Sequence, residues 1–191
     1  MSKHIKSNSI RIIAGKWRGR RLPVLEAQGL RPTTDRVRET LFNWLMHDVA
    51  GSRCLDVFAG SGALGLESLS RGAKDAHFFE SNSAVAKNLN RSIEALELDL
   101  HGSKAKVITG DALKLLSGMA SDPFDIVFLD PPFKADVIQQ CVELLENNGW
   151  LSETALIYLE CDKQRDLNMP AHWKLHRQGT TVQSRYQLYH R

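Results

Sequence analysis

The segment from Cys54 to Gly72 reads CLDVFAGSGALGLESLSRG, and the expected architecture follows from it. Its apolar start, residues 55–58, has the length and the flanking turn of a buried strand. Gly60, Gly62 and Gly65 follow at G-x-G-x-x-G spacing, and leucines then recur at helical spacing. A strand, a tight turn and a helix are therefore predicted, with bare glycine backbone that a nucleotide-like cofactor can approach. Alternatively, the glycines serve only the turn and close helix packing.

Two acids near this turn bear on which cofactor it holds. Glu80 lies 20 residues beyond Gly60, where an acid can contact a ribose. Asp56 lies inside the strand, and the pattern Asp-x-Phe-x-Gly-x-Gly resembles motif I of class I methyltransferases, which use S-adenosylmethionine. A carboxylate there suits the positively charged end of that cofactor but not the pyrophosphate of a dinucleotide. Plainer interpretations stay open: Asp56 as a cap of the turn, and Glu80 as an ordinary strand-end acid.

Strands and helices alternate after this segment. Apolar runs predict further strands at residues 76–79, 105–109, 124–129 and 155–159, and helical spacing predicts helices between them. The C-terminal tail predicts two more strands, 173–177 and 182–189, around Gly179. The fold class is therefore α/β: a doubly wound, mainly parallel seven-stranded sheet of the Rossmann-like type.

Composition excludes several classes of protein. The 191 residues suit one domain, and 42% hydrophobic with 25% charged residues is ordinary for a soluble globular protein. No apolar run is long enough to span a membrane, and the first residues lack a signal-peptide core. Cys54, Cys141 and Cys161 lie far apart, which favours reduced thiols and a cytoplasmic location. No metal site is expected, since His172 and His176 have no cysteine or acidic partners.

The net charge of +3 is unevenly distributed. Residues 1–40 contain ten Lys or Arg and three acids, a net +7, and the remaining residues carry −4. Residues 10–13 and 20–24 predict a hairpin within a basic extension, residues 1–30, that precedes the methyltransferase domain, residues 31–191. Its candidate RNA-binding residues are Arg11, Lys16, Trp17, Arg18, Arg20 and Arg21, with cations for phosphates and Trp17 for stacking on a base. The plainer alternative is a solvated basic face with Trp17 packed inward.

The segment RPTTDRVRETLFNWL, residues 31–45, predicts a helix capped by Thr34. Val37, Leu41 and Trp44 give it an apolar face that packs on the sheet. Thr34 and Arg38 at its polar end are candidates for contact with the cofactor. They could equally be a cap and a surface residue.

The motif that carries the chemistry is Asp130-Pro131-Pro132-Phe133, directly after the fourth predicted strand. In an open α/β sheet this position faces the same crevice as the glycine turn. The Asp side chain and an adjacent backbone carbonyl offer two acceptors to one amino group, because proline leaves no N–H there. Phe133 offers a flat face for a base. Asp130 as a simple turn former is the alternative.

This motif resembles the (Asn/Asp)-Pro-Pro-(Tyr/Phe) motif IV of amino-group methyltransferases. Together with residues 31–45 and the basic arm, the whole chain resembles the RsmD family, bacterial enzymes that methylate the 2-amino group of one guanine in 16S rRNA. The resemblance implies that S-adenosylmethionine is bound by Asp56, Gly60, Gly62, Glu80 and Asp111. It further implies that the target base is held by Asp130, Pro131 and Phe133. Asp111 could instead only cap a helix.

The resemblance also implies a partner and a setting: 16S rRNA within a 30S subunit or an assembly intermediate, no membrane, and a monomer without an obligate protein partner. Motif IV by itself does not separate guanine from adenine, so an adenine amino-methyltransferase acting on RNA or DNA is the alternative enzyme. An NAD-dependent oxidoreductase and a non-catalytic RNA-binding assembly factor are the alternatives of other classes.

Overall fold

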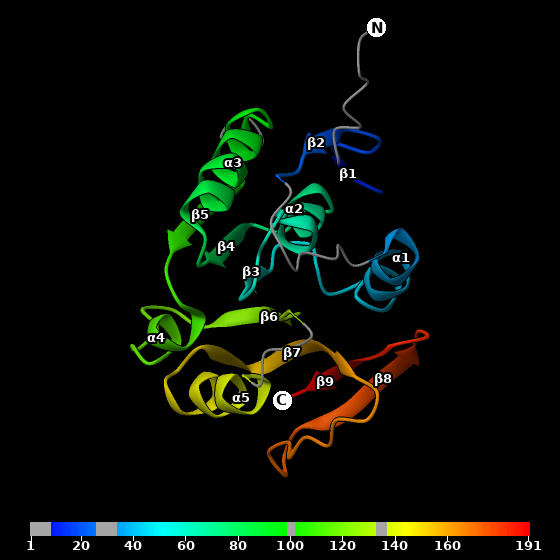
Figure 1. Ribbon diagram of the computed structural model, residues 1–191, viewed down its shortest axis with the longest axis vertical. Helices are drawn as coiled ribbons and strands as arrows, with labels where there is room; N and C mark the ends of the chain where they lie inside the picture. The colour runs from blue at the N-terminus through cyan, green and yellow to red at the C-terminus, as the bar shows by residue number, and fades with distance from the viewer. Residues whose placement is uncertain (1–8, 26–33, 99–101, 133–136) are drawn as a thin grey trace, which may run out of the picture.

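The computed structural model describes residues 9–25, 34–98, 102–132 and 137–191. Its centre is a seven-stranded sheet in the order β5-β4-β3-β6-β7-β9-β8 (Figure 1). The strands are β3 (Arg53–Asp56), β4 (Asp75–Glu80), β5 (Lys104–Thr109), β6 (Phe124–Leu129), β7 (Leu151–Asp162), β8 (Lys174–Thr180) and β9 (Ser184–His190). Strands β3 to β7 pair in parallel, and β9 pairs antiparallel with both β7 and β8. The predicted doubly wound, mainly parallel sheet is confirmed.

The order of the strands places a crevice at one point of the sheet. The chain starts in the middle at β3, runs outward through β4 to β5, and returns to the other side of β3 with β6. Ligands of open α/β sheets bind beyond the carboxyl ends of the strands at such a reversal. The glycine turn after β3 and the Asp-Pro-Pro motif after β6 therefore lie on neighbouring strands at the same edge.

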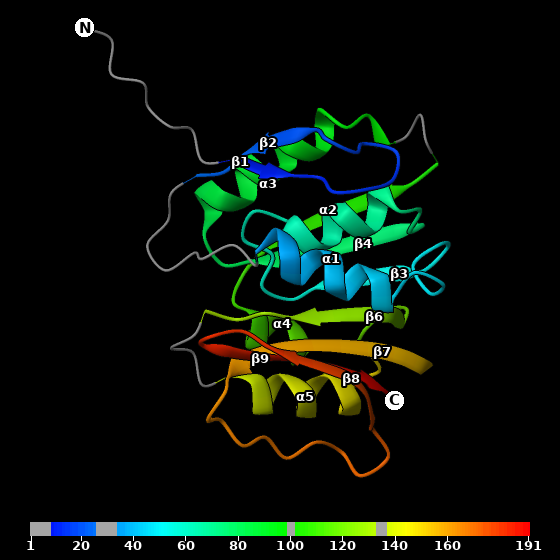
Figure 2. The same cartoon turned by 90° about the vertical axis from the view of Figure 1, so that its right-hand side faces the viewer.

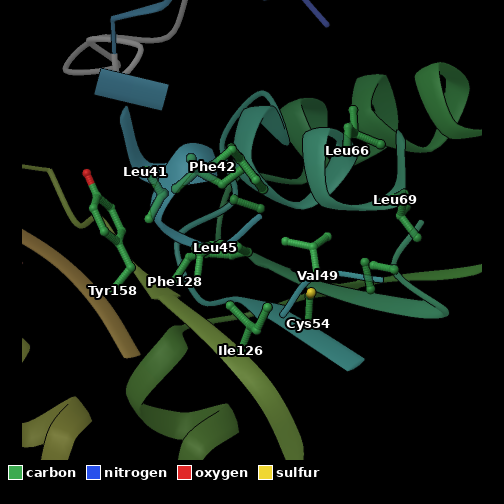
Figure 3. Close-up of a cluster of buried hydrophobic side chains, with 14 of the residues drawn as sticks. Leu41, Phe42, Leu45, Val49, Cys54, Leu66, Leu69, Ile126, Phe128 and Tyr158 are labelled. Atoms are coloured by element: carbon green, nitrogen blue, oxygen red, sulfur yellow. The ribbon is translucent and has the colours of Figure 1, made fainter. Parts of the chain in front are cut away.

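Helices cover both faces of the sheet. The helices α1 (Asp35–Trp44), α2 (Ala63–Ser70) and α3 (Ser83–Glu94) lie on one face, and α4 (Ala112–Leu116) and α5 (Ile138–Asn147) lie on the other (Figures 1 and 2). A separate hydrophobic cluster fills each interface. Figure 3 shows the first cluster, where α1 and α2 pack on β3, β6 and β7. Burial on both faces explains why the central strands are almost entirely apolar.

Helix α1 begins where the sequence predicts. The Thr34 side chain accepts a hydrogen bond from the Val37 amide at 3.4 Å, so Thr34 is the N-cap. Leu41 and Phe42 on its inner face are fully buried, which extends the predicted apolar face by one residue. Trp44 is only half-buried and stacks on Tyr186, with ring centroids 5.5 Å apart.

The basic hairpin forms as predicted, from β1 (Ser9–Arg11) and β2 (Arg21–Pro23) paired antiparallel. It lies over α2 and α3 (Figure 2). Ile10, Ile12 and Leu22 join the same hydrophobic cluster as α1 and α2. Trp17 also joins it and is only 7% exposed, so its predicted stacking on an RNA base is wrong. Burying its large apolar surface stabilises the hairpin on the domain more than exposure would.

The C-terminal hairpin differs from the prediction in the place of its turn. Gly179 lies within β8 opposite Tyr186, and residues 181–183 make the turn. A Cβ at Gly179 would overlap the Tyr186 ring, so this glycine permits close approach of two strands and not a reversal. Strand β7 is also longer than predicted and continues past Leu159 through Glu160.

Within the described residues, no helix is long and apolar enough to cross a membrane. The three cysteines are free and buried.

Candidate functional site

Four acids lie at the carboxyl ends of the central parallel strands. Asp56 ends β3, Glu80 ends β4, Asp111 follows β5, and Asp130 follows β6. Because β4, β3 and β6 are neighbours in the sheet, residues 74 positions apart in the sequence meet at one edge. The sequence predicted each acid separately, and the sheet order brings them together.

The glycine turn needs its glycines for two different reasons. Gly60 and Gly62 have φ angles of 50° and 77°, in the left-handed region that other residues adopt only at a cost. Gly65 has an ordinary conformation, but a Cβ there would overlap the Phe78 ring of β4. The turn geometry and the close packing of α2 on the sheet are therefore both real uses of the motif.

Asp56 is buried beneath this turn. Its side chain is 2% exposed and accepts a hydrogen bond from the Gly65 amide at 3.1 Å. Burial raises the pKa of the Asp56 carboxyl to about 7; the Gly65 bond acts in the opposite direction and the Glu80 charge in the same one. Asp56 does cap the turn, as the plainer interpretation held. A cation placed beside it would favour its ionised form.

Glu80 fastens the turn to the next strand. Its Oε2 accepts from the Gly60 amide at 2.8 Å, and its Oε1 accepts from the Asn82 amide at 2.7 Å. Asn82 in turn caps α3. Each carboxylate oxygen has a second lone pair that a hydroxyl group can use. Glu80 is thus more than an ordinary strand-end acid, since it ties the glycine turn after β3 to the start of the β4-to-α3 connection.

Asp111 is the N-cap of α4, because its Oδ1 accepts from the Lys114 amide at 3.0 Å. This confirms the cap. A carboxylate has a second oxygen that such a bond does not use, so capping is compatible with a ligand contact.

The donors and acceptors of this edge suit a cationic cofactor better than a phosphate. A phosphate at a helix N-terminus needs free backbone amides. Here the Gly60 amide donates a hydrogen bond to Glu80, and the Gly65 amide donates one to Asp56. The edge therefore presents carboxylates to a ligand, and S-adenosylmethionine, with a sulfonium and an ammonium group, fits that set. The dinucleotide alternative does not fit it.

Asp130 and Pro131 lie at the same carboxyl edge of the sheet, on the β6 side. Asp130 is half-buried and Pro131 is buried. They lie one and two residues beyond the last residue of β6, beside β3 and β7. Phe133, the third predicted member of this group, lies outside the described residues.

Thr34 and Arg38 have structural partners. Thr34 caps α1. Arg38 is 2% exposed, and its Nη2 donates to Asp35 Oδ1 at 2.6 Å and to the Arg11 carbonyl oxygen at 2.9 Å. The interpretation of Arg38 as a surface residue is wrong, because it ties α1 to the hairpin. Contact of either residue with the cofactor stays a prediction.

The predicted RNA-binding cations are exposed on the hairpin and its loop: Arg11, Lys16, Arg18, Arg20 and Arg21. The loop is fixed to the C-terminal half of α2. Glu67 is fully buried and accepts from the Ile13 amide at 2.7 Å and the Ala14 amide at 3.0 Å. The Ser70 hydroxyl accepts from the Trp17 amide at 3.1 Å. The helix that starts at the cofactor turn therefore also carries the basic loop.

Sequence reasoning missed two acids of this region, Glu67 and Glu160. Glu67 is an acid on the buried side of an otherwise apolar helix, and that departure from the pattern was the available signal. Glu160 directly follows the predicted fifth strand, as Asp130 follows the fourth. Among the described residues, no group of acids, histidines and cysteines could hold a metal ion.

Known proteins are similar to this chain in sequence and in fold. The model of the family described as Conserved hypothetical protein 95 matches residues 10–190. The "Ribosomal RNA small subunit methyltransferase D" of Escherichia coli K12 is 48% identical over 189 residues, 98% of this chain and 93% of that protein. The Haemophilus influenzae protein of the same name is 49% identical over 181 residues, 94% of this chain and 93% of that one.

Solved structures of other proteins have a similar fold. The yhhF protein of Escherichia coli has a TM-score of 0.87 at 47% identity, covering 96% of this chain and 98% of that one. An RNA methyltransferase from Salinibacter ruber, solved with S-adenosyl-L-homocysteine, has a TM-score of 0.61 at 17% identity, covering 84% and 93%. That second likeness shows the fold alone. With its family model matched from the first hairpin to the last strand, this chain belongs to the Conserved hypothetical protein 95 family, the RsmD family, and has the class I methyltransferase fold.

Proposed function

We propose that this protein transfers the methyl group of S-adenosylmethionine to the exocyclic 2-amino group of one guanine in 16S rRNA. The observation that carries the proposal is the carboxyl edge of the sheet. There the amides of the glycine turn donate hydrogen bonds to Asp56 and Glu80, and the Asp130-Pro131 motif follows the adjoining strand. Family membership and the names of the relatives support rRNA as the acceptor.

The cofactor binds along the carboxylates of the edge. Asp56 lies toward the methionine end, Glu80 accepts from the ribose hydroxyls, and Asp111 accepts from the adenine. Gly60 and Gly62 let the ligand approach the backbone. When bound, S-adenosylmethionine supplies a methyl group on a positively charged sulfur.

Asp130 and the Pro131 carbonyl oxygen then act on the amine. An exocyclic amine is a poor nucleophile because its lone pair is delocalised into the ring. Two acceptors that accept hydrogen bonds from both N–H groups of the amine favour a pyramidal nitrogen whose lone pair points at the methyl group. As the N–C bond forms, the S–C bond breaks to leave a neutral thioether, and the methylated nitrogen then releases one proton. Phe133 stacks on the base. Positioning of this kind supplies most of the rate enhancement, and the target base must leave its stack or be unpaired.

RNA is held by the exposed cations of the hairpin: Arg11, Lys16, Arg18, Arg20 and Arg21. Since Glu67 and Ser70 fix the hairpin loop to α2, these cations keep a constant position relative to the cofactor turn. The protein acts as a cytoplasmic monomer, on rRNA within a small subunit or an assembly intermediate.

The test is a labelled-methyl transfer assay with S-adenosylmethionine, with unmodified 16S rRNA and assembled small subunits offered side by side. Nucleoside mass analysis should find the label on the 2-amino group of guanine. Label on adenine would keep the mechanism and overturn the base. Cofactor binding without transfer to either RNA would overturn the proposed acceptor, and the absence of cofactor binding would favour a non-catalytic assembly factor.

A further inference from the structure

A second carboxylate lies beside Asp130. Strands β6 and β7 are parallel, and their last paired residues are Phe128 with Tyr158 and Leu129 with Leu159. Asp130, the first residue beyond β6, and Glu160 on β7 directly follow the pair Leu129–Leu159, so continuing that register by one residue places them on adjacent strands, about 4.8 Å apart between backbones. Residues at matched positions of parallel strands point to the same face. The Asp130 charge also contributes to the raised pKa of Tyr158, which agrees with this proximity.

Glu160 is held in one orientation. It is 7% exposed, its Oε2 accepts from the Tyr158 hydroxyl at 3.0 Å, and its Oε1 accepts from the Ser184 hydroxyl at 2.7 Å. Tyr158 rises from β7 beside Leu41 of α1 (Figure 3). These donors come from two strands, β7 and β9, so the carboxylate is fixed from both sides.

The described part of the domain gives Glu160 two hydroxyl donors and no cationic partner. Among residues 9–25, 34–98, 102–132 and 137–191, no arginine or lysine forms an ion pair with Glu160. Each hydrogen bond that a buried carboxylate accepts offsets part of the cost of removing it from water. Each of its oxygens keeps a second lone pair. A donor on a ligand can therefore bond this carboxylate without displacing either hydroxyl.

The bases differ in what they present to such a carboxylate. Beside its 2-amino group, guanine has an N1–H, which is a donor. Adenine has at N1 an acceptor, beside its 6-amino group. Two adjacent carboxylates that only accept match the two adjacent donors of guanine and repel the N1 of adenine.

We propose that Glu160 accepts the N1–H of the target guanine while Asp130 holds its 2-amino group, which makes Glu160 a specificity-determining residue. The inference rests on the proposed function and supplies what motif IV lacks, a means to tell guanine from adenine. The hydroxyls of Tyr158 and Ser184 aim the carboxylate. A site built to bond a donor rejects analogues that lack it, because its own buried group is then left unpaired.

The test uses 2-aminopurine, which keeps the 2-amino group but has an acceptor at N1. The target RNA, once mapped, is prepared with guanine or 2-aminopurine at the methylated position, and both compete in one reaction. Glu160→Gln keeps the size of the side chain and adds an amide donor that can pair with the N1 of 2-aminopurine. The hydroxyls of Tyr158 and Ser184 can rotate to suit the amide. We expect the preference for guanine to fall at least about tenfold in this variant relative to wild type.

Internal competition makes the ratio independent of how much enzyme is folded. Glu153→Gln, an exposed glutamate of the same strand, is the matched control and should keep the wild-type ratio. An unchanged ratio in Glu160→Gln, or no methylation of 2-aminopurine by it, would overturn the inference while the proposed function stands. Failure of the wild type to methylate guanine at the 2-amino group would overturn the proposed function, and this inference with it.

Discussion

Glu67 is the residue whose replacement should best reveal how the hairpin is attached. In Glu67→Ala the amides of Ile13 and Ala14 lose their acceptor, and Arg71 loses a partner at 2.7 Å. An unsatisfied, partly buried amide costs about 1–2 kcal/mol, so the two together should lower the free energy of unfolding by about 2–4 kcal/mol. The Arg71 side chain is 18% exposed, so loss of this partner adds to that cost. For a chain of 191 residues this corresponds to a fall of about 4–16 °C in Tm.

The measurements are urea unfolding for the free energy, calorimetry for Tm, and binding of RNA and cofactor by the same protein. The hairpin cations depend on this attachment, so RNA affinity should fall more than cofactor affinity. Glu153→Ala, on an exposed part of β7, should change stability by less than about 0.5 kcal/mol. A loss below about 1 kcal/mol in Glu67→Ala, or equal losses of RNA and cofactor binding, would refute the reasoning.

Three further predictions concern the site. Asp130→Ala should lower turnover at least about a hundredfold with little change in cofactor affinity, because Asp130 orients the amine and not the cofactor; single-turnover rates and calorimetric titration measure the two. The triple replacement Arg18/Arg20/Arg21→Ala should weaken RNA binding. In a salt titration, the slope of the logarithm of the binding constant against the logarithm of the salt concentration should become shallower by about 0.7 for each single-strand phosphate that the variant no longer neutralises. Burial raises the pKa of Asp56 to about 7, so the folded protein binds a proton that the unfolded chain has released, and stability should fall as the pH rises from about 4 to 7. Asp56→Asn should abolish that part of the pH dependence in urea unfolding.

Each of these has an outcome that contradicts it. Equal losses of turnover and cofactor binding in Asp130→Ala would remove its assigned role. The double replacement Lys174/Arg177→Ala on exposed β8 is the control for charge, and a loss of RNA binding per cation removed equal to that of the triple replacement would point to a general charge effect. Identical pH profiles for wild type and Asp56→Asn would show that Asp56 does not titrate in this range.

Features that depend on local pattern could be predicted from the amino-acid sequence. Residues a few positions apart determine the apolar runs, the glycine turn and the helix caps. The sequence could therefore predict the alternation of strands and helices, the cap at Thr34, and the acids Asp56, Glu80 and Asp130. The family signature in residues 31–45 and 130–133 was likewise readable, and the match over residues 10–190 confirms it.

Contacts between distant segments needed the folded chain. Trp17 turned inward because the hairpin packs on α2, and no local pattern records that interface. Glu67 is an apparent misfit in its own helix until the amides of residues 13 and 14 are placed against it. The place of Glu160 next to the end of β6 follows from the parallel pairing of β6 and β7 after a crossover through α5, which sets a register between residues 30 positions apart. Register across a crossover depends on packing of the whole sheet, and that is why the sequence predicted Asp130 but neither Glu160 nor its place beside that strand end.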